Sequence, residues 1–122
     1  NGSLYWDMLK LFTEIKSAIN SCALSENKDI KSISIDTWGV DFGLLDATGQ
    51  LMANPYNYRN PDFSYDLMDE VHSIIPKEEL YKITGTQFLN FNSIYQLYHI
   101  AKNKYRMENA KELLFVPDLH RK

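Results

Sequence analysis

The first stretch of the chain has the hydrophobic spacing of a helix. Over residues 3 to about 23, apolar side chains recur every third or fourth position, which predicts an amphipathic helix with Ser3 as its N-cap and Asp7 in its first turns. Cys22 lies on the apolar face, so we expect it to be a small buried filler. A polar loop is predicted at residues 25–29. The apolar face comprises Leu4, Met8, Leu11, Phe12, Ile15, Ile19 and Cys22.

The spacing then changes to that of extended chain. Residues 31–37 and 40–46 alternate apolar and polar side chains, a pattern typical of strands. Turn residues ending in Gly49 separate the second of these from a third extended segment at residues 51–56. Pro55 places that third segment at an edge or an end. We therefore predict three antiparallel strands joined as a meander.

The second half of the chain is predicted to be mainly helical, which makes the whole an α/β domain. Its apolar positions return to helical spacing, and proline and glycine mark where helices start and stop. The predicted elements are a helix at 64–75, a helix from Pro76 to Gly85, a longer helix capped by Ser93, a helical turn at 108–111 and a buried strand at 113–116.

Composition narrows the class of protein. A chain of 122 residues with 44% hydrophobic and 24% charged residues is long enough for one domain with its own core. Thirteen basic against sixteen acidic side chains give a net charge of −3, so neither nucleic acid nor an anionic membrane is expected as a partner. A single cysteine and the absence of a signal peptide or a long apolar run favour a cytoplasmic protein.

The bend at Trp38 and Gly39 is the most distinctive chemical feature. An indole face, a backbone without a Cβ, and the carboxylates of Asp36 and Asp41 together suit a sugar, although Trp38 would serve equally well as a core residue. No metal site is expected, because the three histidines lack the spacing of ligands. There is also no G-x-x-x-x-G-K-[ST] loop to cradle a phosphate.

Residues 34–46 resemble the sugar-site strand pair of the rhamnulose branch of the FGGY family of carbohydrate kinases. Further segments agree with that family in the same order along nearly the whole chain. They are Asn1-Gly2, Tyr5-Trp6-Asp7, Pro55, Tyr58-Arg59, Glu79-Leu80-Tyr81, residues 84–88, residues 91–97 and Val116-Pro117-Asp118.

The resemblance implies the ribonuclease-H-like fold of actin and hexokinase, with residues 1–122 as an incomplete N-terminal, sugar-binding domain. The first phosphate hairpin and the C-terminal nucleotide domain would lie outside this chain. The implied activity is transfer of the γ-phosphoryl group of ATP to L-rhamnulose in rhamnose catabolism. ATP and Mg²⁺ are expected in the complete kinase, while this segment alone is expected to be inactive and to bind neither tightly. Its expected partners are the sugar and the remainder of the kinase chain.

The resemblance also implies a set of substrate-binding residues. Aromatic rings would pack on the sugar or shield it, Gly39 would let it approach the backbone, and the arginine and asparagine would hydrogen-bond its oxygens. No catalytic residue is expected here, because the family's proton-abstracting aspartate follows later in the sequence. The implied substrate-binding residues are Trp38, Gly39, Tyr58, Arg59, Phe91 and Asn92.

Each of these residues also has a purely structural interpretation. Asn92 could be only a turn residue at a helix start, and Arg59 could pair with Asp62 on the surface. Tyr58 and Phe91 are as typical of a core as of a ligand platform.

The family's usual Tyr-Arg-Asp-x-Arg-Thr reads Tyr-Arg-Asn-Pro-Asp-Phe at residues 58–63, which puts the conformation of this loop and the sugar specificity in question. A kinase of another ketose and a non-catalytic sugar-binding module therefore remain alternatives.

Overall fold

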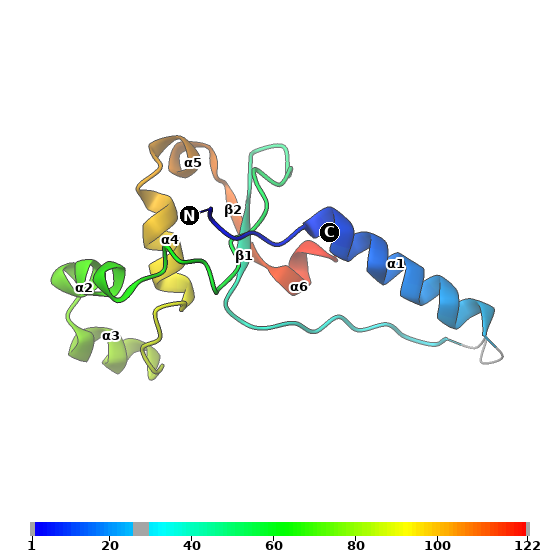
Figure 1. The fold of residues 1–122 in the computed structure, drawn as a ribbon, viewed down its shortest axis with the longest axis horizontal. Helices are drawn as coiled ribbons and strands as arrows, with labels where there is room; N and C mark the ends of the chain where they lie inside the picture. Colours follow the sequence, from blue (N-terminus) through cyan, green and yellow to red (C-terminus); the bar gives the residue numbers. More distant parts are fainter. Residues whose placement is uncertain (1, 26–29, 122) are drawn as a thin grey trace.

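The structure, a computed structural model, describes residues 2–25 and 30–121. Within these ranges it is a mixed α/β arrangement in which a two-stranded sheet lies between a projecting N-terminal helix and a group of helices (Figure 1). This agrees with the predicted α/β class. The elements are α1 (Met8–Leu24), β1 (Phe42–Leu45), α2 (Tyr65–Ile74), α3 (Lys77–Thr84), α4 (Ser93–Ala101), α5 (Lys104–Asn109), β2 (Glu112–Phe115) and α6 (Val116–Leu119).

Helix α1 begins at Met8, so the predicted start at residue 3 is wrong. Asp7 is the N-cap, and its carboxylate accepts a 2.9 Å hydrogen bond from the backbone N–H of Lys10. Ser3, the predicted cap, instead donates its hydroxyl to Asp62 at 2.8 Å. The preceding residues run as extended chain because they pair with the segment near Tyr56 through an isolated bridge from Tyr5.

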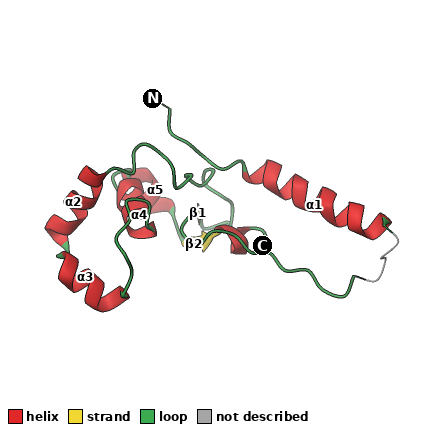
Figure 2. Cartoon of the chain, turned by 60° about the horizontal axis from the view of Figure 1, so that its bottom comes forward, coloured by secondary structure: helices red, strands yellow, loops and turns green. Residues whose placement is uncertain are grey.

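The apolar face of α1 is only partly covered within the described residues. Met8 is buried and Phe12 is 44% exposed, while Leu11, Ile15 and Ile19 are partly buried. Cys22 is exposed, so the prediction that it fills a core is wrong. Figures 1 and 2 show the reason, since the far half of α1 projects away from the sheet and the other helices. Of the predicted loop at 25–29, only Ser25 lies within the described residues, and Asn1 and Lys122 also lie outside them.

The sheet is not the predicted meander. Strand β1 pairs antiparallel with β2 from the end of the chain, with Phe42 opposite Phe115. Residues 31–37 form no strand and run as an extended segment toward β1 (Figure 2). The predicted antiparallel return of segment 51–56 beside β1 is confirmed only at its start, where Leu45 and Leu51 form an isolated bridge and the Met52 N–H donates to the Leu44 carbonyl at 3.0 Å. Alternating side chains indicate an extended backbone but do not determine which strand it pairs with. Here β2, from the end of the chain, pairs along one edge of β1.

The turn after β1 follows its prediction. The Asp46 carboxylate accepts hydrogen bonds from the Thr48 hydroxyl at 2.6 Å, the Thr48 N–H at 2.8 Å and the Gln50 N–H at 3.1 Å. The Thr48 hydroxyl is the largest of the causes that lower the pKa of Asp46. Gly49 has a φ of 79°, which explains why glycine is needed here.

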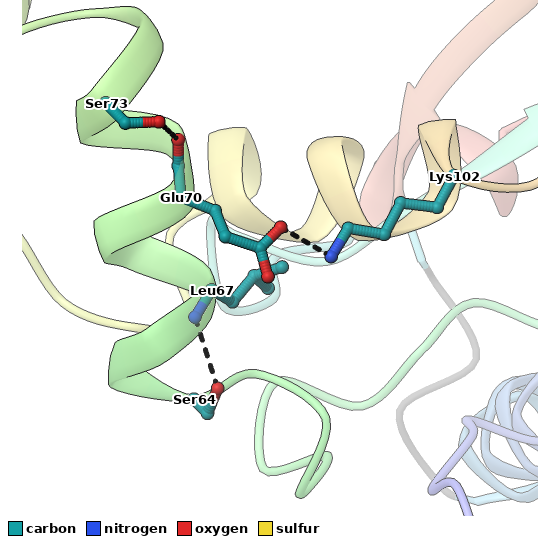
Figure 3. Close-up of polar contacts among 5 residues, drawn as sticks. All are labelled: Ser64, Leu67, Glu70, Ser73 and Lys102. Atoms are coloured by element: carbon teal, nitrogen blue, oxygen red, sulfur yellow. Dashed lines mark hydrogen bonds and ion pairs between the residues drawn. The ribbon is translucent and has the colours of Figure 1, made fainter.

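Helices α2 and α3 agree well with the sequence. The Ser64 hydroxyl caps α2 by accepting the N–H of Leu67 at 3.2 Å (Figure 3). Helix α3 follows Pro76 and ends at Gly85, whose φ of 61° is left-handed as predicted. Lys102 at the end of α4 pairs with Glu70 of α2 at 2.7 Å, as Figure 3 shows. Burial between α2 and α4 forms the apolar cluster, which consists of Phe63, Leu67, Met68, Val71 and Tyr95.

Three further boundaries differ from the predictions. Asn92, not Ser93, occupies the N-cap position of α4, because the Ser93 hydroxyl donates to the carbonyl of Val40 at 2.7 Å instead. The predicted helical turn at 108–111 is the end of α5, which begins at Lys104. The late strand is present as β2, but it is partly exposed, and the buried Val116 begins α6.

Candidate functional site

Asp41 is the centre of the candidate site. It immediately precedes β1 and its side chain is fully buried. Oδ2 accepts hydrogen bonds from Trp6 Nε1 at 2.6 Å, Trp38 Nε1 at 2.8 Å and the Tyr58 backbone N–H at 3.1 Å. Oδ1 accepts from Gln96 Nε2 at 2.7 Å. Protein donors therefore hold both oxygens, three on Oδ2 and one on Oδ1, and the side chain has no exposed atom.

The structure changes the roles that the sequence suggested for Asp36 and Asp41, the two aspartates near the bend. Asp41 faces the interior, so its oxygens do not reach a ligand's hydroxyl groups. Asp36 is exposed and accepts the N–H of Thr37 at 2.9 Å. It does not end a strand, because residues 31–37 form none.

Two indole rings share the Asp41 carboxylate. The ring centroids of Trp6 and Trp38 are 4.3 Å apart, with the planes tilted by 35°. Trp6 comes from the segment before α1, which the N–H of Trp6 fixes by donating to the carbonyl of Pro55 at 2.9 Å. The Trp38 N–H is consumed by Asp41, so this residue can offer a ligand only its half-exposed ring. The sequence analysis did not include Trp6 in the site, although Tyr5-Trp6-Asp7 was part of the family resemblance.

The Phe91–Asn92 turn is tied to the same centre. Gln96 Nε2, besides donating to Asp41, donates to the carbonyl of Phe91 at 2.9 Å. The Asn92 side chain donates to the carbonyl of Gln87 at 2.7 Å, which supports its structural interpretation as a turn residue. Gln96 was absent from the predicted site, although it lies within residues 91–97, a segment that was part of the family resemblance.

Gly39 and Asn92 lie together at one pocket. Its volume is about 260 Å³, and a Cβ placed on Gly39 would meet open space, with nothing within 4 Å. The other lining residues mix hydroxyl groups with apolar side chains: Val40, Leu80, Thr84, Thr86, Phe88, Ser93 and Ile94. A wall of this kind suits a ligand with both hydroxyl and hydrocarbon faces.

Tyr58, Arg59 and Phe91 line a second pocket of about 530 Å³. The rings of Tyr58 and Phe91 meet edge to face at 5.6 Å, and the Arg59 guanidinium carbon lies 5.4 Å from the Tyr58 ring centroid. Phe91 and Asn92 are consecutive, so each pocket takes one lining residue from this turn. Five of the six predicted residues thus line one or other of these two pockets, while Trp38 lines neither and is tied to Asp41 through its indole N–H.

Comparison with known proteins identifies the sequence relatives of this chain. No family model matches the chain. A rhamnulokinase from Halalkalibacterium halodurans is 40% identical over 119 residues, which is 97% of this chain and 25% of that protein. Rhamnulokinases from Bacteroides thetaiotaomicron and Mannheimia succiniciproducens are 40% and 38% identical over 118 and 120 residues, in each case 24% of the relative. This chain is homologous to rhamnulokinases. It spans about a quarter of the length of these curated relatives.

The homology confirms the resemblance seen in the sequence, and the structure shows what the departure from the usual rhamnulokinase loop does. Asn60 is 3% exposed, and its side chain accepts the N–H of Leu4 at 3.0 Å and donates to Asp62 at 3.1 Å. Phe63 enters the apolar cluster. The substituted residues therefore anchor the N-terminal segment and the core.

Asp62 does not pair with Arg59. Its carboxylate accepts the Ser3 hydroxyl and the Asn60 amide, and these two hydrogen bonds, Ser3 first, lower the pKa of Asp62. The Arg59 side chain is exposed, and the ion pairs found in the described part of the chain do not involve it.

Two further features were searched for in the described ranges, 2–25 and 30–121. No group of three or more histidine, cysteine, aspartate or glutamate side chains is placed to hold a metal ion there. None of the helices in these ranges combines the length and the apolar character that crossing a bilayer requires.

Proposed function

We propose that this chain is a sugar-binding segment of a carbohydrate kinase that transfers the γ-phosphoryl group of ATP to L-rhamnulose, giving L-rhamnulose 1-phosphate. Homology to rhamnulokinases supports the reaction class. The observation that carries the assignment to the sugar is the convergence of the Trp38, Tyr58 and Phe91 segments on Asp41. These segments are the ones that the resemblance implies for the sugar.

The pocket residues have complementary tasks in this proposal. A sugar hydroxyl both donates and accepts, so the Asn92 amide and the threonine hydroxyls near it suit such a ligand. The planar Arg59 fork would donate to a sugar oxygen, and Tyr58 and Phe91 would cover the apolar side of the ring or chain. Gly39 leaves open the space into which the ligand would fit.

ATP and Mg²⁺ are proposed for the complete kinase, but the described residues do not fit either group. Asp41 is fully buried among protein donors, and the described ranges hold no cluster of acidic side chains suited to a metal. The sequence also lacks a phosphate-cradling glycine loop. We therefore assign phosphoryl transfer and the removal of the hydroxyl proton to other parts of a longer protein, and only sugar positioning to this segment.

We further infer that residues 1–122 belong to an N-terminal, ribonuclease-H-like domain of a cytoplasmic kinase. The relatives are about four times as long as this chain, which supports a larger assembly. The incompletely covered apolar face of α1, where Phe12 is 44% exposed, supports a neighbouring part of the same kinase as its cover.

The direct test is a kinase assay of the complete protein against a panel of ketoses. We expect the highest kcat/KM with L-rhamnulose. The substituted loop at Asn60, Asp62 and Phe63 favours the second candidate, a kinase of another ketose, which activity on a different sugar alone would establish. Sugar binding without phosphoryl transfer would instead establish a non-catalytic module.

A glycine substitution tests the pocket itself. Gly39→Val should raise the KM for the sugar by about tenfold or more, since Gly39 lines the pocket and its Cβ position meets only open space. Gly2→Val is a matched control, because a Cβ at Gly2 also meets open space but lies outside the pocket. Equal sugar KM values for the two variants would remove Gly39 from the site.

A further inference from the structure

Asp41 is a buried carboxylate held by neutral donors. None of the ion pairs identified in residues 2–25 and 30–121 involves it, and its partners are two indoles, a backbone N–H and an amide. Taking a carboxylate out of water is costly unless hydrogen bonds replace its hydration. The four donors are therefore constrained to point at one spot, and the segments that carry them are constrained with them.

Three of those donors belong to segments that carry the proposed sugar residues. Trp38 adjoins Gly39, and its Nε1 bond fixes the ring at the bend. The Tyr58 N–H begins the segment that contains Arg59. Gln96 links Asp41 to the Phe91 carbonyl, one residue before Asn92.

Asp41 itself lines neither pocket, which separates its role from that of a ligand contact. The pocket at Gly39 and Asn92 and the pocket at Tyr58, Arg59 and Phe91 do not include it. Because both oxygens are held by protein donors and no atom of the side chain is exposed, Asp41 can affect a ligand only through its partners.

We propose that Asp41 is a positioning residue for the sugar and that Gln96 relays its effect to the Phe91–Asn92 turn. The proposal rests on the proposed function, because it takes the two pockets that share the Phe91–Asn92 turn as the sugar site. Asp41 and Gln96 hold the bend, the Tyr58–Arg59 segment and the turn in one arrangement, so that a ketose meets all three at once.

The first test is Asp41→Asn in the complete kinase. An amide nitrogen cannot accept, so at least one of the four donors loses its partner while the size of the side chain is kept. We expect the KM for the sugar to rise roughly tenfold or more, with kcat and the KM for ATP within about twofold of the parent. A loss of folded protein alone would lower the apparent kcat and leave the sugar KM unchanged.

Asp46→Asn is the matched control. Asp46 also accepts three hydrogen bonds, but they serve the turn after β1 and reach none of the proposed sugar residues. Its sugar KM should stay within about twofold of the parent. If Asp41→Asn and Asp46→Asn give the same sugar KM, the proposal is wrong.

Gln96→Leu and local hydrogen exchange keep the test decisive if Asp41→Asn does not fold. Gln96→Leu removes the relay and should also raise the sugar KM. Amides at residues 91–93 should exchange faster in both variants and not in Asp46→Asn. Unchanged exchange would overturn the positioning role, as would faster exchange without a change in sugar KM. If the parent phosphorylates no ketose, the proposed function fails, and the exchange data alone decide the role of Asp41.

Discussion

Two buried clusters meet on α4, and they are built in opposite ways. Tyr95 belongs to the apolar cluster. Its neighbour Gln96 belongs to the Asp41 cluster, which consists of Asp41 and its four donors, from Trp6, Trp38, Tyr58 and Gln96. The apolar cluster is stabilised by the area it removes from water and has no directional requirement. The Asp41 cluster depends on four donors aimed at one carboxylate. One helix thus joins a region that fixes stability to a region that fixes the geometry of the pockets.

The difference teaches where substitutions should act. A change of volume in the apolar cluster costs stability, while a repacked side chain of similar size costs little. In the Asp41 cluster, a change of chemistry at constant size leaves a buried donor without a partner. The following predictions are arranged from the largest expected effect to the smallest, and each tests the separation between the clusters.

Leu67→Ala should destabilise α2 by about 2–5 kcal/mol, because Leu67 is buried in the apolar cluster. Native-state hydrogen exchange of the α2 amides measures this local free energy. The sugar KM should remain that of the parent. A sugar KM as high as that of Asp41→Asn would show that the two clusters act as one.

Asn92→Ala should lower kcat/KM for the sugar by the equivalent of roughly 1–3 kcal/mol, because it removes a pocket amide and its bond to Gln87. Asn109→Ala is a suitable control, since the Asn109 amide makes a similar 2.8 Å bond to the Tyr105 carbonyl. Steady-state kinetics with the sugar as the varied substrate distinguishes them. Unchanged kinetics for Asn92→Ala would leave Asn92 with its structural role only.

Ser64→Ala should cost about 1 kcal/mol of α2 stability, because the hydroxyl that accepts the Leu67 N–H is lost (Figure 3). Exchange of the first amides of α2 is the measurement. A helix cap is a local feature, so neither the exchange of residues 91–93 nor the sugar KM should respond. Faster exchange at residues 91–93 or a higher sugar KM would show that the start of α2 is coupled to the Asp41 cluster.

Asp62→Asn should alter stability in a pH-dependent way. The pKa of Asp62 is lowered in the folded chain by the Ser3 hydroxyl and then the Asn60 amide, so its contribution is complete above the ordinary aspartate value of 3.8. That contribution is lost as the pH falls through the folded pKa. The difference between parent and Asp62→Asn should be constant above about pH 5 and shrink below it. Growth of the difference on acidification would contradict the assigned cause.

The sequence predicted the features whose signals are local. Ser64 before α2, Gly85 after α3 and the turn at Asp46–Gly49 each carry their own capping or turn chemistry. The pairing of β1 with β2 was not foreseen, because period-two alternation does not name a distant partner. The start of α1 was misplaced since Ser3 is held by Asp62, a tertiary contact that overrides a good capping residue.

The sequence pointed to the residues that line the two pockets but not to the hydrogen bonds that connect them, because those bonds join residues distant in the sequence. The family resemblance supplied Gly39 and Asn92, which line one pocket, and Tyr58, Arg59 and Phe91, which line the other. The network that organises them was missed. Its members Trp6 and Gln96 are far apart in the sequence. A buried polar side chain interrupts the apolar pattern, but the pattern does not indicate which residue it hydrogen-bonds.

The paired indoles give this corner of the molecule its own optical signature. Trp6 and Trp38 are the two tryptophans of the chain, and their rings lie close enough to couple electronically. At the long-wavelength end of the near ultraviolet, where tyrosine absorbs little, the absorption of this chain therefore comes from one pair of neighbouring rings. Separation of the segment that carries Trp6 from β1 would part the two rings, so the near-ultraviolet circular dichroism should change even where the helices stay intact.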